Sequence, residues 1–259
     1  MKIYRKRISA FALSLTLSIT SIAQDKDILP GDEGALRIEK AGLKLPREAS
    51  PRENHLSQGP FKRLVIRGAN LVDGTGAPAI GPVDIVIEGN RITSITTVGS
   101  PGVPIKEDSR PAKGDHEIDA HGAYILPGFI DAHSHIGNAL WGLTGDMPSM
   151  DYIFKLWMSH GITTSREVGC GMGADFTLRQ KRRSAANEIT APRLMVHCGF
   201  PTNFSTDKQA RKWVKGLKKR GADGIKFFGG NPTVLEAAFD EAKKQKLRTA
   251  FHHAQLSVS

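Results

Sequence analysis

The chain has 259 residues, of which 39% are hydrophobic and 24% charged. That composition permits a substantial buried core and excludes an intrinsically disordered protein. The formal net charge is +10 at pH 7, and the two cysteines, Cys170 and Cys198, are too few for a disulfide framework, although they leave a single bridge open.

The N-terminus has the three parts of an export signal. A basic start is followed by the apolar run Ile8 to Ala23, with the small residues Ser21 and Ala23 just before Gln24. We therefore expect residues 1–23 to be a cleaved signal peptide and the mature protein to be periplasmic or secreted. The alternative is an uncleaved membrane anchor. We do not expect a stable anchor, because the run is short for a spanning helix and polar residues follow it.

Residues 24–60 contain prolines, glycines and scattered charges without apolar periodicity, which predicts a loosely ordered leader. Short β runs follow up to residue 126. Gly89-Asn90 is a two-residue hairpin turn between two of them. The predicted strands of this small β unit cover Leu64 to Ile66, Asp84 to Ile87 and Ile92 to Ile95.

From Pro127 onward, predicted strands and helices alternate, which favours a parallel sheet with covering helices. Apolar stripes around Ile153, Trp213 and Leu235 predict three helices, with Asp207 and Asn231 as candidate N-caps for the second and third. A complete (β/α)8 TIM barrel takes about 250 residues. The fold class predicted is therefore α/β, a partial (β/α)8 barrel of about five β/α units. The predicted strands cover Phe129 to Ile136, Ile162 to Val168, Arg193 to Gly199, Gly224 to Phe228 and Arg248 to His253.

His133 and His135 lie two residues apart on the first of these strands, so both side chains leave the same face. They lie near its C-terminal end, where barrel enzymes place their active sites. A pair of neutral imidazoles there suits a divalent metal such as zinc. By itself, a His-x-His pattern more often consists of surface or hydrogen-bonded histidines, so the surrounding sequence decides between the two interpretations.

That surrounding sequence, Leu126 to His135, resembles the strand-1 metal motif of the amidohydrolase superfamily, in the branch that attaches a β-sandwich to the barrel. Several separate motifs in the same order make the resemblance specific, over about residues 62 to 259. The other matching segments are Leu71 to Gly76, Ile87 to Ile92, Gly161 to Gly169, Gly221 to Phe228 and His252 to Gln255. After the signal peptide 1–23 and the leader 24–60, the resemblance divides the chain into the N-terminal part of a β-sandwich domain, 61–126, and the first part of the barrel, 127–259.

Lys226 and a strand-5 histidine complete the metal ligands that the resemblance implies. Lys226 falls on a strand that we expect to be buried, where a lysine without a partner tends to lose its proton. In the family, the lysine at this place reacts with carbon dioxide to give a carbamate that bridges two metals. The match to the family favours His253 as the strand-5 ligand. Because adjacent strand residues face opposite sides, a shift of one residue would instead select His252.

The resemblance implies a metal-dependent hydrolase that acts on carbon–nitrogen bonds through a metal-activated hydroxide. Its expected cofactors are divalent metals, two zinc ions, with a carboxylated lysine at Lys226. The metal ligands are then His133, His135, Lys226 and His253. The expected substrates are small molecules with a non-peptide amide, a cyclic amide or a dipeptide bond, as in prolidase-like and imidazolonepropionase-like enzymes.

The family's strand-6 histidine and its general-base aspartate of strand 8 have no counterpart in these 259 residues, so no catalytic residue is assigned. We therefore expect an N-terminal fragment of a longer hydrolase, weakly active or inactive alone. The alternative is a non-catalytic, exported metal-binding or interaction protein of the same fold. We expect no nucleic-acid partner, because the basic residues between Lys208 and Arg220 lie on the helix face opposite Trp213 and Leu217. The sequence leaves an oligomer possible.

Overall fold

The computed structural model describes residue 42 and residues 44–53, 58–137 and 147–252. The predicted signal peptide and His253 lie outside these ranges. The chain divides into two compact units, which are treated separately below: a β unit, Arg52–Phe129, and a barrel unit that combines Met1–Pro51 with Ile130–Ser259. Among the described residues, no helix combines the length and the apolar character needed to cross a membrane.

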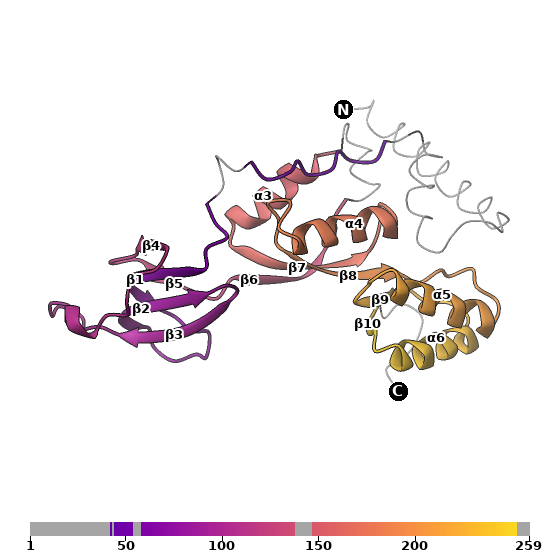
Figure 1. The fold of residues 1–259 in the computed structure, drawn as a ribbon. Coiled ribbons are helices and arrows are strands. Elements are labelled where there is room, and N and C mark those ends of the chain that lie inside the picture. Colours follow the sequence, from indigo (N-terminus) through magenta and orange to yellow (C-terminus); the bar gives the residue numbers. More distant parts are fainter. Residues whose placement is uncertain (1–41, 43, 54–57, 138–146, 253–259) are drawn as a thin grey trace, which may run out of the picture. The chain divides into compact units, whose positions relative to one another are not determined.

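The β unit is a five-stranded sheet with the order β3-β2-β1-β4, in which β5 also pairs with β1 (Figure 1). β1 pairs antiparallel with β2, and β2 with β3, while β4 and β5 run parallel to β1. Glu88 at the end of β2 faces Arg91 at the start of β3, which confirms the predicted Gly89-Asn90 hairpin. The strands are β1 Arg63–Leu71, β2 Ile80–Glu88, β3 Arg91–Thr97, β4 His116–Asp119 and β5 Tyr124–Ile125, and the 3-10 helix η2 is Glu107–Ser109.

Asp84 of β2 is a fully buried carboxylate. Arg67 and Arg110 donate to it through guanidinium nitrogens at 2.9 Å, and Gly68 N donates at 2.9 Å. Gly68 has φ +72°, and the ring of His121 lies 2.6 Å from the point where a Cβ would stand, so only glycine fits this turn of the chain. The close approach of the backbone to Asp84 therefore depends on the glycine.

The barrel unit contains a five-stranded sheet with the order β10-β9-β8-β7-β6. The pairings of β7 with β8, β8 with β9, and β9 with β10 are parallel, and a helix separates each strand from the next along the chain (Figure 1). The predicted α/β fold, a run of five barrel strands after a small β segment, is confirmed. The strands are β6 Phe129–Ser134, β7 Ile162–Gly169, β8 Arg193–Gly199, β9 Gly224–Phe227 and β10 Arg248–Phe251, and the helices are α3 Met150–Ser159, α4 Ala174–Ala185, α5 Asp207–Lys219 and α6 Pro232–Lys244.

The helix ends follow their capping residues. Asn231 is confirmed as the N-cap of α6, since its side chain accepts a hydrogen bond from Thr233 N at 3.0 Å. The prediction of Asp207 as the N-cap of α5 is wrong by one residue. Thr206 is the cap, because it forms a reciprocal capping box with Gln209, and Asp207 is the first helical residue.

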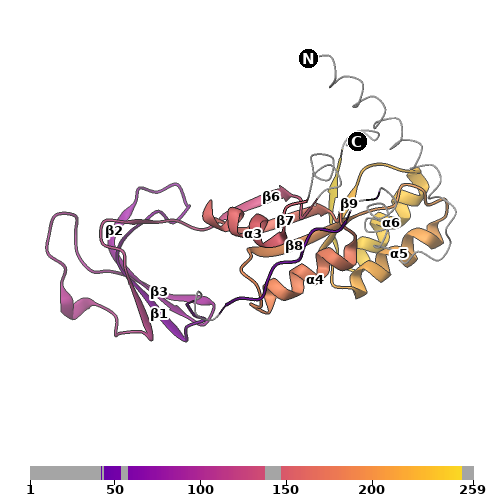
Figure 2. The same cartoon turned by 90° about the horizontal axis from the view of Figure 1, so that it is seen from above.

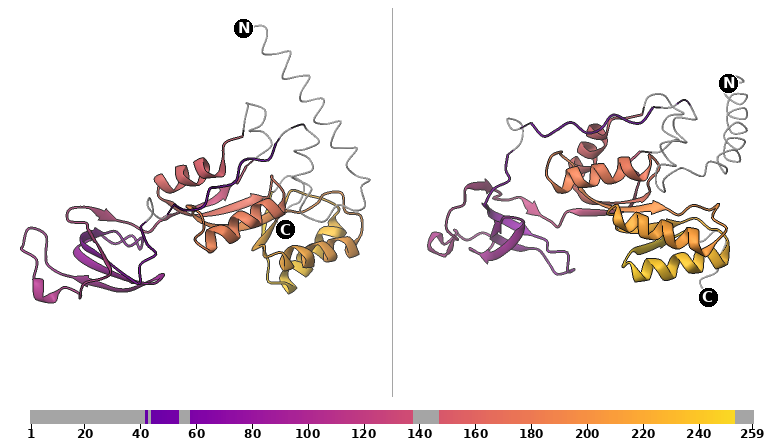
Figure 3. Two further views of the ribbon diagram at one scale, coloured as in Figure 1. Left: turned by 45° about the horizontal axis from the view of Figure 1, so that its top comes forward. Right: turned by 45° about the vertical axis from the view of Figure 1, so that its right-hand side comes forward.

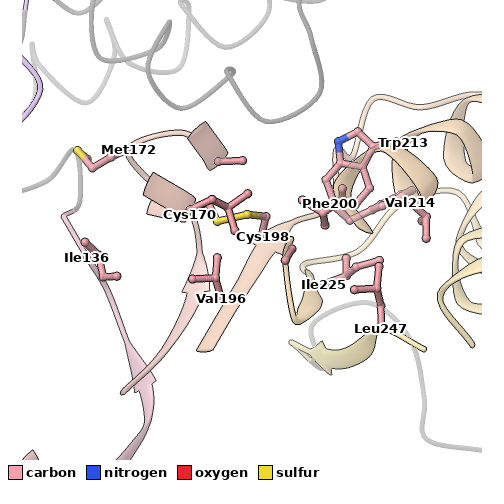
Figure 4. Packing of buried hydrophobic residues seen from close by; sticks show 14 of the residues in the cluster. Ile136, Cys170, Met172, Val196, Cys198, Phe200, Trp213, Val214, Ile225 and Leu247 are labelled. Atoms are coloured by element: carbon pink, nitrogen blue, oxygen red, sulfur yellow. A yellow bond between two sulfur atoms is a disulfide. The ribbon is translucent and has the colours of Figure 1, made fainter. Parts of the chain in front are cut away.

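The core of the barrel unit lies between the sheet and its helices. The four apolar side chains of α5, Ala210, Trp213, Val214 and Leu217, are buried as predicted. The rings of Phe200 and Trp213 meet edge to face with centroids 5.4 Å apart. Figure 4 shows this contact, with Ile225 of β9 nearby. The basic residues of α5 lie on its other side, exposed or half-buried, which confirms the predicted solvent-facing helix surface.

Cys170 and Cys198 form a disulfide with their Cα atoms 4.8 Å apart (Figure 4). Cys170 directly follows β7, and Cys198 lies in β8, where it pairs with Gly169. Both cysteines are buried. The bridge therefore ties together the carboxyl ends of two neighbouring strands.

Residues 44–53, part of the predicted leader, pack on the barrel unit. Figures 2 and 3 show this indigo segment running alongside α3 and α4. Glu48 accepts hydrogen bonds from Arg179 Nε at 2.6 Å and Arg183 Nη1 at 3.2 Å, and Arg183 also donates to the carbonyl of Ala49 at 2.7 Å. These contacts, a backbone hydrogen bond from Met150 N to the Arg47 carbonyl and the burial of Ala49 in the apolar core hold this segment.

Replacing Glu48 with alanine is expected to lower the free energy of unfolding of the barrel unit by about 0.5–1 kcal/mol, because the ion pairs are partly exposed. Urea unfolding followed by tryptophan fluorescence measures this change, which should shrink as salt is added. Glu236→Ala, on an exposed position of α6, is the matched control. An equal loss in both variants would contradict a specific role for Glu48.

Candidate metal site on the barrel unit

His133, near the end of β6, and His135, directly after the strand, lie on one side of the sheet. The ring centroids of His133 and His135 are 5.5 Å apart and edge to face. Asp131, two residues earlier on the same face, accepts a hydrogen bond from His133 N at 2.9 Å. Asp131 therefore binds the backbone of His133. Ser134 points to the other side, where its hydroxyl meets that of Ser165. The strand alternation predicted for the pair is thus present.

Lys226 is a buried cation on β9, only 4% exposed. Its strand neighbours Ile225 and Phe227 belong to the apolar core, so alternation puts Lys226 on the opposite side of the sheet. Burial lowers its pKa, and the positive charge of Arg166 lowers it further. The Lys226 ammonium in turn acts on both β6 histidines, favouring their neutral forms. The fold therefore brings His133, His135 and Lys226 within electrostatic range of one another.

The two histidines differ in their electrostatic surroundings. Burial lowers the pKa of His133, and the charge of Lys226 adds to that effect. The pKa of His135 is raised instead, chiefly by the carboxylate of Glu167. His135 Nδ1 lies 3.8 Å from Glu167 Oε1. His135 thus has an acidic neighbour as well as the cation.

The role of Glu167 in this region was not predicted from the sequence. From the sequence alone, Arg166 and Glu167 could either contact substrate or pair with each other. In the structure Arg166 Nε donates to the carbonyl of Ala132 at 2.7 Å, while Glu167 accepts from the backbone N–H groups of Ile136 and Cys170. The two side chains therefore bind different partners. No sequence motif signalled these backbone contacts.

The strand-5 ligand stays a prediction, because His253 lies outside the described residues. Its neighbour His252 is described and exposed. In the register of β9 and β10, Ala250 pairs with Lys226, so His252, two residues later, falls on the side of Lys226. Its ring lies beside that of Phe228 with centroids 6.0 Å apart. The alternation along β10 thus keeps His252 as an alternative ligand.

The donor atoms fit a divalent metal in their chemistry. Within the described ranges, no group of three or more His, Cys, Asp and Glu side chains is arranged to hold a metal ion. The site instead consists of two imidazoles and a buried amine. Imidazole nitrogens are good zinc ligands, and the lowered pKa of Lys226 favours the neutral amine that reacts with carbon dioxide. Carbamylation would add the oxygen ligands that the bare lysine lacks.

His197 lies on β8 and is packed in the interior of the same unit. It is 1% exposed, and neither ring nitrogen has a hydrogen-bond partner among the described residues. Burial lowers its pKa to about 4. Gly224 of the neighbouring strand makes room for the ring, since a Cβ there would lie 2.2 Å from His197 Cδ2. The imidazole is therefore held neutral.

Comparison with known proteins gives relatives that are much longer than the matched segments. No family model matches the chain. An N-acyl-D-aspartate deacylase from Alcaligenes xylosoxydans xylosoxydans is 34% identical over 180 residues, which cover 69% of this chain and 30% of the deacylase. A 5-methylthioadenosine/S-adenosylhomocysteine deaminase from Desulforamulus reducens is 34% identical over 114 residues, 43% of this chain and 25% of the deaminase. The matches thus span less than a third of these relatives.

Solved structures agree on the fold. A Xaa-Pro dipeptidase with bound methionine superposes with a TM-score of 0.55 at 19% identity, covering 73% of this chain and 56% of the dipeptidase. Molinate hydrolase gives a TM-score of 0.55 at 16% identity, with 74% and 54% covered. These proteins, like the deacylase and the deaminase, are members of the amidohydrolase superfamily. Sequence and fold together place the chain in that superfamily.

Proposed function

We propose that this chain forms the N-terminal part of a metal-dependent hydrolase acting on carbon–nitrogen bonds of small amides, cyclic amides or dipeptides. The observation that carries the proposal is the grouping of His133, His135 and the buried Lys226 on one side of the barrel sheet. The relatives support the reaction class, because their names describe a deacylase, a deaminase and a dipeptidase. The partial coverage of those relatives supports the proposal that further barrel strands belong to the working enzyme.

We assign His133, His135 and Lys226 as metal ligands, with His253, or His252 if the register of β10 continues, as the fourth ligand and zinc as the metal. The imidazoles of His133 and His135 donate nitrogen lone pairs. Burial lowers the pKa of Lys226 and so favours the neutral amine, which can attack carbon dioxide, form an N–C bond and release one proton to give a carbamate. A divalent metal held by this set would polarise the scissile carbonyl and lower the pKa of a bound water.

Zinc titration of the complete 259-residue chain tests the site. With bicarbonate present, competition against a chromophoric chelator should show zinc binding that Lys226→Met weakens at least tenfold. Lys208→Met, on the exposed face of α5, is the matched control and should bind zinc like the unaltered chain. Labelling with 13C-bicarbonate should give a carbamate NMR signal that only Lys226→Met loses. Unchanged zinc affinity in Lys226→Met would refute the carbamate ligand.

A panel of N-acyl-D-amino acids, cyclic amides and dipeptides then tests the reaction. Zinc-dependent hydrolysis of one class, lost in Lys226→Met, would support the proposed activity and name the substrate class. Stoichiometric zinc without hydrolysis of any of them would favour a non-catalytic metal-binding protein. Absence of zinc binding by the unaltered chain would contradict a metal site built from these residues.

We further propose that the protein is exported to the periplasm or secreted, with residues 1–23 removed. The Cys170–Cys198 disulfide supports this location, because such bonds persist in oxidising compartments. Expression in a bacterial host, followed by intact mass and N-terminal sequencing of the periplasmic and medium fractions, tests it. The expected first residue is Gln24. A full-length chain retained in the cytoplasm would contradict the proposal.

A further inference from the structure

Glu167 lies next to His135 as a buried carboxylate fixed from two sides. Its side chain has no exposed surface. One oxygen accepts a hydrogen bond from Ile136 N, in the residue directly after His135, and the other accepts from Cys170 N at 2.8 Å, in the turn after β7. The second oxygen also lies 3.8 Å from His135 Nδ1. Backbone N–H groups just after β6 and just after β7 therefore set the position of this carboxylate beside the imidazole.

We propose that Glu167 is the positioning residue of His135, and that the Cys170–Cys198 disulfide keeps Glu167 in place. A neutral imidazole carries one N–H, and the nitrogen that faces a carboxylate is the one that keeps it. At 3.8 Å from Nδ1, the Glu167 charge favours the tautomer with the proton on that nitrogen and the lone pair on Nε2. The inference rests on the proposed function only in naming a metal as the group that Nε2 would bind.

The disulfide enters because it secures the turn that supplies one of these hydrogen bonds. Cys170 has φ +55°, a left-handed backbone conformation that residues other than glycine seldom adopt. Its sulfur is bonded to Cys198 of β8, and its carbonyl accepts from Gly173 N at 2.8 Å. These bonds hold the Cys170 N–H pointing at Glu167. Without the sulfur bond, the turn can relax and withdraw that N–H.

Opening of the bond is a two-electron step. A dithiol reductant would supply two electrons and two protons, giving a thiol on each cysteine while the reductant closes to a disulfide. The predicted consequence is a His135 ring that is no longer held in one tautomer. The double variant Cys170→Ala/Cys198→Ala reproduces the loss of the bridge without a reductant.

The imidazole tautomer measures the proposal directly, without metal or catalysis. In the complete oxidised chain, labelled with 15N-histidine and free of metal, long-range 1H–15N NMR spectra should show His135 with its proton on Nδ1. Glu167→Gln should give a mixture of tautomers, because an amide can either donate or accept there. The double cysteine variant should shift the mixture in the same direction. Glu236→Gln on the exposed side of α6 should leave the spectrum unchanged.

Zinc affinity supplies the second readout. Loss of an outer hydrogen-bond partner typically weakens metal binding by about 10–100-fold, so Glu167→Gln should weaken it within that range. An unchanged His135 tautomer in a folded Glu167→Gln protein would overturn the role of Glu167. An unchanged tautomer in the double cysteine variant would overturn the role of the disulfide. If Glu167→Gln fails to fold, Glu167→Asp takes its place, and a pure Nδ1–H tautomer with undiminished zinc affinity would then refute the role of Glu167.

The two proposals can fail separately. If the unaltered chain has the Nδ1–H tautomer but binds no zinc, the metal-site proposal fails while the positioning by Glu167 stands. If it binds zinc with mixed tautomers at His135, the positioning proposal fails while the proposed function stands.

Discussion

Replacing Asp84 with alanine should lower the free energy of unfolding of the β unit by about 3–5 kcal/mol, as expected when one partner of a buried ion pair is removed. Asp84 is fully buried, and its two oxygens accept from Arg67, Arg110 and Gly68 N. Alanine would leave a cavity beside both guanidinium groups, which would keep only their partly exposed second partners, Glu117 for Arg67 and Glu107 for Arg110. The loss should exceed that of Asp84→Asn, which keeps an acceptor oxygen.

The pH dependence of this contribution has a defined sign. Burial acts to raise the pKa of Asp84, but the hydrogen bonds from Arg110, Arg67 and Gly68 outweigh it and hold the pKa below the ordinary value of 3.8. A carboxyl group whose pKa is lower in the folded than in the unfolded state stabilises the fold at pH values above its unfolded-state pKa. That stability should be complete at neutral pH and be lost as the pH falls through the folded-state pKa.

Hydrogen exchange of the β1 and β2 amides in urea measures the loss. Asp108→Ala, at an exposed acidic position of η2, is the matched control and should change stability by less than about 0.5 kcal/mol. Equal protection of the amides in Asp84→Ala and in the unaltered protein would contradict the proposed role of Asp84.

Replacing His197 with leucine should remove much of the acid sensitivity of the barrel unit. His197 has an ordinary pKa of 6.5 and a folded-state pKa of about 4, because burial disfavours the imidazolium. Between these values the unfolded chain binds a proton that the folded chain does not, so stability falls as the pH falls. The shift corresponds to about 3 kcal/mol in total. Above pH 6.5 the ring is neutral in both states and this penalty disappears.

Urea unfolding at pH 7.5 and pH 4.5, followed by tryptophan fluorescence, measures the effect. The stability difference between the two pH values should be about 2–3 kcal/mol smaller in His197→Leu than in the unaltered chain. At pH 7.5 leucine should be tolerated, because both ring nitrogens that it replaces lack partners. His160→Gln, at an exposed position, should retain the original acid sensitivity. Identical pH dependence in His197→Leu would refute the explanation.

Local patterns predicted most of the fold. The Gly89-Asn90 turn between apolar runs gave the β2–β3 hairpin, and the Trp213 stripe gave α5. The helix α4 was missed because its buried face includes Thr177 and Gln180, so its sequence has no apolar stripe. Polar residues such as Thr177 and Gln180 can be buried by parts of the chain that are distant in sequence, and the local sequence pattern does not show those parts.

The sequence predicts the parts of the candidate site that depend on alternation along one strand. It does not predict the contacts that depend on which strands are neighbours. His133 and His135 share a face because they are two residues apart, and Lys226 drew attention as a cation among apolar neighbours. The contact of Glu167 with Ile136 N, by contrast, exists only because β6 and β7 are adjacent. The Cys170–Cys198 bridge likewise depends on the register of β7 with β8.

The packing of residues 44–53 on α4 has a consequence for synthesis on the ribosome. Glu48 bonds to Arg179, 131 residues later in the sequence, and the whole β unit lies between them. Glu48 must therefore leave the exit tunnel long before its partner helix exists. The β unit can fold before this segment has a partner. The Glu48–Arg179 contact is therefore expected to form late, after the second β/α unit of the barrel, β7 and α4, has been synthesised.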